Sequence, residues 1–130
     1  MGTILVRIVA PVSTDGARRH ESIQALCDVV HRLNVSFLRA NPNFPPLYRS
    51  GVRYGREPIA EREQFCTAPA TLVQGWGDCD DLAPWRSAEL VVRRGLDARP
   101  LVTQVRPGLW HVVVELGGGR IEDPSRVLGM

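Results

Sequence analysis

The stretch that decides the fold is GWGDCDDLAPWRSAELVVRRG, residues 75–95. Gly75 and Gly77 allow the chain to turn sharply, and Asp78 is a favoured residue at the N-terminal cap of a helix. We therefore expect a helix that begins near Asp78 and ends with this stretch. Cys79 would lie in its first turn, where unpaired N–H groups stabilise a thiolate. The apolar residues of this helix fall on one buried line, which comprises Leu82, Trp85, Ala88 and Val92.

Antiparallel strands are predicted after this helix. Residues 98–105 and 109–116 are rich in β-branched and apolar residues, and a Pro-Gly turn separates them. The glycines at 117–119 then close a tight hairpin into 120–123. Because the side chains of a strand alternate between its two faces, His111 points away from the residues that face the core. The core-facing residues are Trp110, Val112, Val114 and Leu116.

The residues before this region contain more helix than strand. A helix over 16–40 carries an apolar stripe at steps of three and four and ends before a proline. We expect these further elements: a strand within 4–12, a cap at Thr14 or Asp15, a long Pro-rich loop over 41–58, a short helix from Pro58 to Phe65 and a turn at Thr71–Gln74. Helices mostly precede antiparallel strands, so the predicted fold class is α+β, with N-terminal helices packed on an antiparallel sheet in a single domain over 1–130.

Length and composition exclude several classes of protein. The chain has 130 residues, 44% of them hydrophobic, and a net charge of +2, which is too weak to indicate nucleic acid or a membrane surface as partner. No stretch has the roughly 18 apolar residues that a membrane-spanning helix needs. Three cysteines without paired spacing argue against a disulfide scaffold and indicate synthesis in the reducing cytoplasm. All 16 basic residues are arginines, which excludes a catalytic lysine.

One constellation of residues carries nucleophilic chemistry. Cys79 opens the predicted helix, His111 lies on a strand that can face the helix start, and Asp123 lies on the neighbouring strand. An imidazole can take the proton of a nearby thiol, and a carboxylate can orient the imidazole ring. The same residue types could hold zinc, but their spacing fits no zinc motif, so we predict neither metal nor cofactor. We assign structural roles to the remaining histidines and cysteines, His20, His31, Cys27 and Cys66.

Three blocks of this sequence resemble the Cys, His and Asp blocks of the transglutaminase-like superfamily: GDCDDLA (77–83), LWHVVVEL (109–116) and IEDPS (121–125). The blocks most resemble small bacterial and phage-encoded cysteine peptidase-like members, and they cover Gly75 to Ser125. The resemblance implies a papain-like core, in which a helix that begins with the cysteine packs on an antiparallel sheet. It also implies that Cys79 is the nucleophile, His111 the general base and acid, and Asp123 the residue that orients His111.

The resemblance implies acyl transfer on a peptide or amide substrate. Cys79 would attack the carbonyl carbon and form a thioester, which water then hydrolyses. The Cys79 N–H and a second donor would hold the oxyanion, and the candidates for that donor are Gln74, Trp76 and Tyr54. Like charge opposes the thiolate, since three carboxylates adjoin Cys79, namely Asp78, Asp80 and Asp81.

Two other functions fit the same blocks. An assembly component, such as a phage virion or tail protein, would keep the fold and work through contacts with protein partners. Such a protein would be made in the cytoplasm and then associate with the virion. A cross-linking transglutaminase would use an amine in place of water, and this amine would come from an external lysine. For the enzyme, the long loop over 41–58 would line the substrate groove.

Overall fold

The structure is a computed structural model that describes residues 5–10, 16–56 and 63–130. It is of the mixed α+β class, as predicted. The helices are α1 (Gly16–Ala40), η1 (a 3-10 helix, Leu47–Arg49), α2 (Ala68–Gln74), α3 (Cys79–Arg94) and α4 (Pro124–Val127). The strands are β1 (Arg7–Ala10), β2 (Arg53–Tyr54), β3 (Glu63–Cys66), β4 (Trp76–Gly77), β5 (Ala98–Arg106), β6 (Leu109–Leu116) and β7 (Arg120–Glu122).

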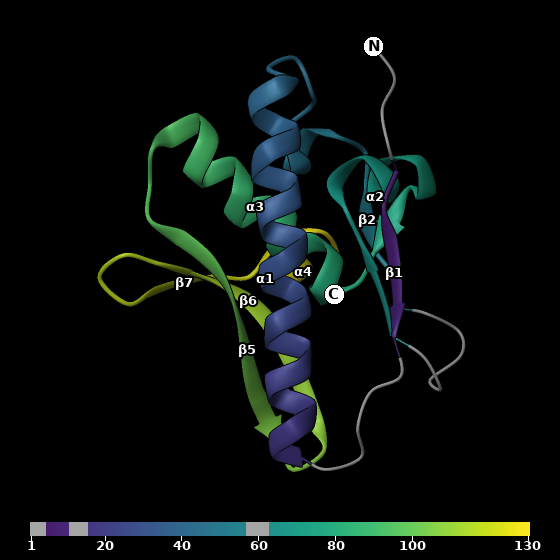
Figure 1. The fold of residues 1–130 in the computed structure, drawn as a ribbon, viewed down its shortest axis with the longest axis vertical. Helices are drawn as coiled ribbons and strands as arrows, with labels where there is room; N and C mark the ends of the chain where they lie inside the picture. Colours follow the sequence, from purple (N-terminus) through teal and green to yellow (C-terminus); the bar gives the residue numbers. More distant parts are fainter. Residues whose placement is uncertain (1–4, 11–15, 57–62) are drawn as a thin grey trace.

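The C-terminal strands form an antiparallel sheet in the order β5-β6-β7. Helices α1 and α3 pack against this sheet, and α1 runs along the long axis of the molecule (Figure 1). The residues buried between them form a group that we call the sheet cluster, which comprises Ile23, Cys27, Val30, Phe65, Ala83, Leu90, Ala98, Val102, Val112 and Val114. Trp110 and Leu116 pack against its edge, so the predicted alternation along β6 is confirmed.

A second apolar group lies on the other side of α3. This loop cluster comprises Leu47, Val52, Ala68, Leu82 and Trp85, and all five side chains are buried. Phe44 adds its ring at 5.4 Å from the ring centre of Trp85. Helix α3 contributes Ala83 and Leu90 to the sheet cluster and Leu82 and Trp85 to the loop cluster. It is therefore the element that both groups share.

The predictions for the long elements are confirmed. Helix α1 spans the predicted residues 16–40, and α3 begins after Asp78 and ends before Gly95, whose positive φ of 62° suits glycine. Of the predicted buried line on α3, Leu82, Trp85 and Ala88 are fully buried, whereas Val92 is half-buried. The caps proposed at Thr14 and Asp15 lie outside the described residues.

Two predictions for the middle of the chain are wrong. Residues 63–65 are not helical but belong to β3, which pairs antiparallel with β1, and residues 57–62 lie outside the described part of the chain. The turn predicted at Thr71–Gln74 is the second half of α2, which begins at Ala68 with a proline in its first turn. Pairing with a distant strand decides the first case, because it overrides the local helix preference of a Glu- and Gln-rich segment.

The long loop is attached to the chain just before α3 by a short parallel pair. Arg53 in β2 pairs with Trp76 in β4, and Tyr54 pairs with Gly77. The sequence analysis did not predict this pair, which places Tyr54 of the loop beside Gly77, two residues before Cys79. Among the helices of the described residues, none is both long and apolar enough to cross a membrane.

Candidate active site

Cys79 is the first residue of α3, directly after the N-terminal cap Asp78. The first N–H groups of a helix have no acceptor within the helix, and the Cys79 amide is one of them. The side chain is half-buried and packs against the sheet cluster, which includes Val112, the neighbour of His111. Helix α3, which begins with this cysteine, packs against β6 and β5.

The start of α3 is fixed by the carboxylate of Asp81. Its Oδ2 accepts a hydrogen bond from the Asp78 N–H at 3.2 Å, and its Oδ1 accepts one from the Cys66 N–H at 2.8 Å. The first bond caps the helix and the second ties it to β3. Asp81 therefore serves the geometry of the helix start, and its charge is balanced by backbone donors.

The protonation of Asp80 bears on whether the three carboxylates beside Cys79 oppose a thiolate there. The side chain is buried, and burial raises the pKa of Asp80 well above its ordinary value, with a hydrogen bond to Asp78 raising it further. In the protonated form that burial favours, Asp80 carries no charge and does not oppose the thiolate. The oxygens of Asp78, Asp80 and Asp81 lie within 4.8 Å of one another, a grouping that helix capping and this proton account for.

His111 and Asp123 are joined by a hydrogen bond. The His111 Nε2 donates to the Asp123 Oδ2 at 2.8 Å, and about 16% and 17% of the two side chains remain exposed. The register explains the contact, because Glu122 pairs with Val114, which puts Asp123 diagonally across from His111 on the same face of the sheet. The predicted pair of strands thus brings this histidine and this carboxylate together.

Asp123 has further donors that hold its carboxylate in place. Its Oδ1 accepts a bond from the Ser125 N–H at 3.2 Å, which caps α4, and the Nε of Arg126 lies 3.4 Å from its Oδ2. The backbone of His111 is also fixed, since the Thr103 hydroxyl donates to its carbonyl oxygen at 2.9 Å. Both members of the pair are therefore anchored independently of each other.

Arg56 is a residue near the thiol that the sequence analysis missed. Its Nε donates to the Tyr54 hydroxyl at 3.2 Å. That hydrogen bond raises the pKa of Arg56, and attraction to Cys79 and Asp78 adds to the shift. A positive charge that acts on Cys79 favours the thiolate. The pairing of β2 with β4 brings Arg56 toward the start of α3. No local sequence pattern predicts this position.

The three candidates for the second oxyanion donor lie close to one another along the chain but differ in their surroundings. The amide of Gln74 is engaged at both ends: its Nε2 donates to the Trp76 carbonyl at 2.8 Å and its Oε1 accepts from Arg7 at 3.3 Å. Tyr54 and Trp76 are half-buried and belong to the paired strands β2 and β4. The Trp76 ring lies over Gly55, where an added Cβ would come within 3.1 Å of it.

The other two cysteines are sealed in the core, as predicted. Cys27 is buried in the sheet cluster and Cys66 at the end of β3. Burial raises the pKa of Cys27 well above its ordinary value and raises that of Cys66 to about 11. At neutral pH both are therefore protonated thiols, and of the three cysteines Cys79 alone is not buried.

The remaining histidines have structural partners. His20 stacks on Trp110 with ring centres 4.9 Å apart and makes a hydrogen bond of 3.0 Å with the Val102 carbonyl oxygen. His31 lies 2.6 Å from the Ser87 hydroxyl on α3. These contacts join α1 to the sheet and to α3, which accounts for both residues without a role in chemistry.

Comparison with known proteins adds no relative. No protein-family model matches the chain, and neither curated proteins nor solved structures give a match. The candidate site accordingly stands on its own geometry, namely a half-buried thiol at a helix start and a hydrogen-bonded His111–Asp123 pair on the adjoining sheet.

Proposed function

We propose that the protein is a cysteine-dependent hydrolase of the transglutaminase-like type, which cleaves amide or peptide bonds through a thioester on Cys79. The observation that carries the proposal is the 2.8 Å bond between His111 and Asp123 on the sheet against which α3, the helix that begins with Cys79, packs. A carboxylate that binds one nitrogen of an imidazole fixes the tautomer and orientation of the ring. A thiol nucleophile needs such an oriented imidazole to take its proton, and the proposal gives this task to His111.

The proposal gives the two nitrogens of His111 different tasks. Because Nε2 binds Asp123, Nδ1 is the nitrogen that takes the thiol proton. The Cys79 sulfur then attacks the substrate carbonyl carbon, and a C–S bond forms while the carbonyl oxygen gains the negative charge. Collapse of this intermediate breaks the C–N bond, and Nδ1 gives its proton to the leaving amine. Asp123 stabilises the charged ring throughout.

Hydrolysis of the thioester completes the cycle. Water loses a proton to His111 as it attacks the acyl carbon, and the C–S bond breaks to release a carboxylic acid and the thiol. The Cys79 N–H is the first oxyanion donor, because it lies at the start of α3. Gln74 donates one of its two amide hydrogens to a backbone carbonyl, so Gln74, Tyr54 and Trp76 all stay candidates for the second donor.

An activated ester tests the proposal without knowledge of the natural substrate. We expect p-nitrophenyl acetate to give a burst of nitrophenolate equal to the number of chains, with the acetyl group mapped to Cys79 by peptide mass analysis. The chain has no lysine, so acetylation of side-chain amines cannot obscure the result. Replacement of His111 by Asn should abolish the burst and leave the circular dichroism spectrum unchanged.

The matched control is Cys66→Ser, which removes a buried thiol and should keep the burst. A burst of the same size in Cys79→Ala, or no burst in a folded wild-type chain, would contradict the hydrolase.

If the folded wild type gives no burst, oligomers in light scattering that persist in Cys79→Ala would support the assembly component. Release of amide-linked product only in the presence of an added amine would instead support the cross-linking reaction.

A further inference from the structure

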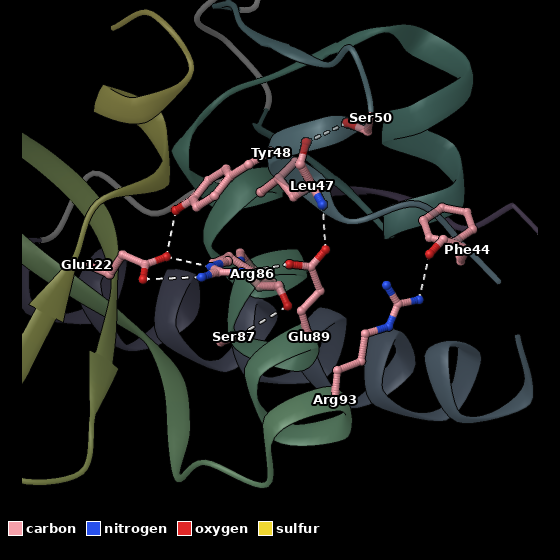
Figure 2. A network of polar contacts seen from close by, with 10 residues as sticks. Phe44, Leu47, Tyr48, Ser50, Arg86, Ser87, Glu89, Arg93 and Glu122 are labelled. Atoms are coloured by element: carbon pink, nitrogen blue, oxygen red, sulfur yellow. Dashed lines mark hydrogen bonds and ion pairs between the residues drawn. The ribbon is translucent and has the colours of Figure 1, made fainter. Parts of the chain in front are cut away.

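A buried polar network lies directly beside the proposed site, on the other face of β7. The carboxylate of Glu122 accepts hydrogen bonds from the Tyr48 hydroxyl at 2.6 Å and from the Nε of Arg86 (Figure 2). A second guanidinium nitrogen of Arg86 lies 3.5 Å from the other Glu122 oxygen. Burial by itself would raise the pKa of Glu122, but these bonds lower it below its ordinary value.

Arg86 carries the network to the other side of α3. Its Nη1 donates to Glu89 at 3.1 Å, and its guanidinium lies 4.6 Å from the centre of the Tyr48 ring. Glu89 in turn accepts a hydrogen bond from the Leu47 N–H (Figure 2). Only 13% of the Arg86 side chain and 4% of the Glu89 side chain are exposed. The network therefore joins η1, α3 and β7 through charged bonds that are shielded from water at Arg86 and Glu89, while 27% of the Glu122 side chain is exposed.

The network ends one residue before Asp123. Glu122 is the last residue of β7, and adjacent residues of a strand point to opposite faces. Glu122 turns toward Arg86 on α3, whereas Asp123 turns toward His111. Strand β7 has only three residues and pairs on one side, with β6, so its own ladder holds it weakly. The charged hydrogen bonds of Glu122, the last residue of β7, add the stabilisation that the few backbone hydrogen bonds of this strand do not provide.

We infer that Glu122 is a positioning residue: held by Arg86 and Tyr48, it fixes the backbone that presents Asp123 to His111. The inference rests on the proposed function for its catalytic meaning, but the positioning itself is a property of the fold. A network that only stabilised the protein would affect its melting temperature and leave the His111–Asp123 bond intact. A positioning network controls that bond in protein that remains folded.

The test compares Glu122→Gln with the matched variant Glu115→Gln, which removes a carboxylate from an exposed ion pair with Arg99 in the same sheet. The readout is the ring Nε2–H of His111 in ¹⁵N-labelled protein, which the bond to Asp123 protects from exchange with water. We expect a resolved signal in the wild type and in Glu115→Gln, and a broadened or missing signal in Glu122→Gln. The acetylation burst should slow by up to about 100-fold in Glu122→Gln alone.

A milder variant covers the case in which Glu122→Gln does not fold. Tyr48→Phe removes one hydrogen bond to Glu122 and keeps the ring against Arg86, and it should weaken the same signal to a smaller extent. Folded Glu122→Gln or Tyr48→Phe protein with the wild-type His111 signal and burst rate would overturn the inference. If Glu122→Gln loses the His111 signal while the wild type gives no acetylation burst, the positioning role is upheld and the hydrolase is refuted. Failure of the inference and failure of the proposed function are therefore distinguishable.

Discussion

Asp123 and Asp80 are two aspartates with opposite surroundings. Asp123 is surrounded by donors from His111, Ser125 and Arg126, which suit an ionised carboxylate. Asp80 is buried beside the carboxylate of Asp78, which suits a neutral acid. The same residue type therefore has two roles, because burial and neighbouring charge decide the protonation state.

The raised pKa of Asp80 predicts how stability depends on pH. The unfolded chain releases the Asp80 proton above the ordinary pKa, whereas the folded chain keeps it until a higher pH, so the folded state binds more protons in between. Stability should therefore fall as pH rises through that interval, by about 1.4 kcal/mol for each pH unit from this group. Asp80→Asn keeps the shape and a donor for Asp78 but has no proton to lose.

We expect Asp80→Asn to be more stable than the wild type at pH 8 and equal to it below the ordinary pKa of an aspartate. Urea unfolding at several pH values measures the difference, in which the titrating groups that do not interact with Asp80 cancel. Equal stability of the two proteins at pH 8 would show that folded Asp80 is ionised at that pH with little penalty. The variant would then give no evidence for a proton near Cys79.

At the scale of elements, the start of α3 depends on close packing before the cysteine. A Cβ added at Gly77 would lie 3.1 Å from side-chain carbons of both Asp81 and Thr71, and 3.2 Å from one of Leu82. These neighbours are buried and belong to helices α2 and α3, so they have little room to move. The glycine is thus required by space rather than by backbone conformation.

Gly77→Ala should therefore destabilise the fold by about 1–3 kcal/mol, as overpacking does in cores. The matched control is Gly16→Ala at the beginning of α1, where an added Cβ meets nothing within 4 Å, and it should leave stability unchanged or slightly higher. Thermal unfolding of both variants measures the contrast. A Gly77→Ala protein as stable as Gly16→Ala would mean that the start of α3 can shift at no cost.

Elements with a strong local pattern were predictable from the sequence, and elements held by distant partners were not. The apolar stripe of α1 and the alternation along β6 gave these elements the correct bounds. Strand β3 and the two-residue pair of β2 with β4 carry no such pattern, because each exists through its partner.

The same contrast holds for the candidate site. Alternation in β6 and a glycine hairpin were enough to predict that His111 and Asp123 meet. The bonds of Tyr48 and Arg86 to Glu122 join residues 74 and 36 positions apart, and neither chain distance leaves a periodic signal. Arg56 was missed for the same reason, since only the fold of the long loop brings it near Cys79.

At the scale of the whole molecule, the two apolar clusters are joined through α3. Val30 belongs to the sheet cluster and Val52 to the loop cluster, and both are buried. Because adjacent residues of one helix serve both clusters, neither cluster can lose its packing while the other remains intact. The described part of the chain should therefore unfold in one step.

Val30→Ala and Val52→Ala are a matched pair for this prediction. Each removes two methyl groups from a buried site and should cost about 2 kcal/mol. In both variants, unfolding followed by circular dichroism and by tryptophan fluorescence should give the same midpoint, shifted from the wild type. Two separate midpoints in Val52→Ala would show that the loop cluster unfolds independently.

The long loop is held at several places along its length. Glu89 binds the Leu47 N–H, β4 pairs with β2, and the Tyr54 N–H donates to the Leu128 carbonyl oxygen at 3.0 Å. The held part of the loop therefore loses its conformational entropy when the protein folds. A ligand that binds against this part would not pay that entropic cost again. Substitution of the solvent-facing side chains of this part of the loop could then change which ligand binds, while the backbone keeps its conformation.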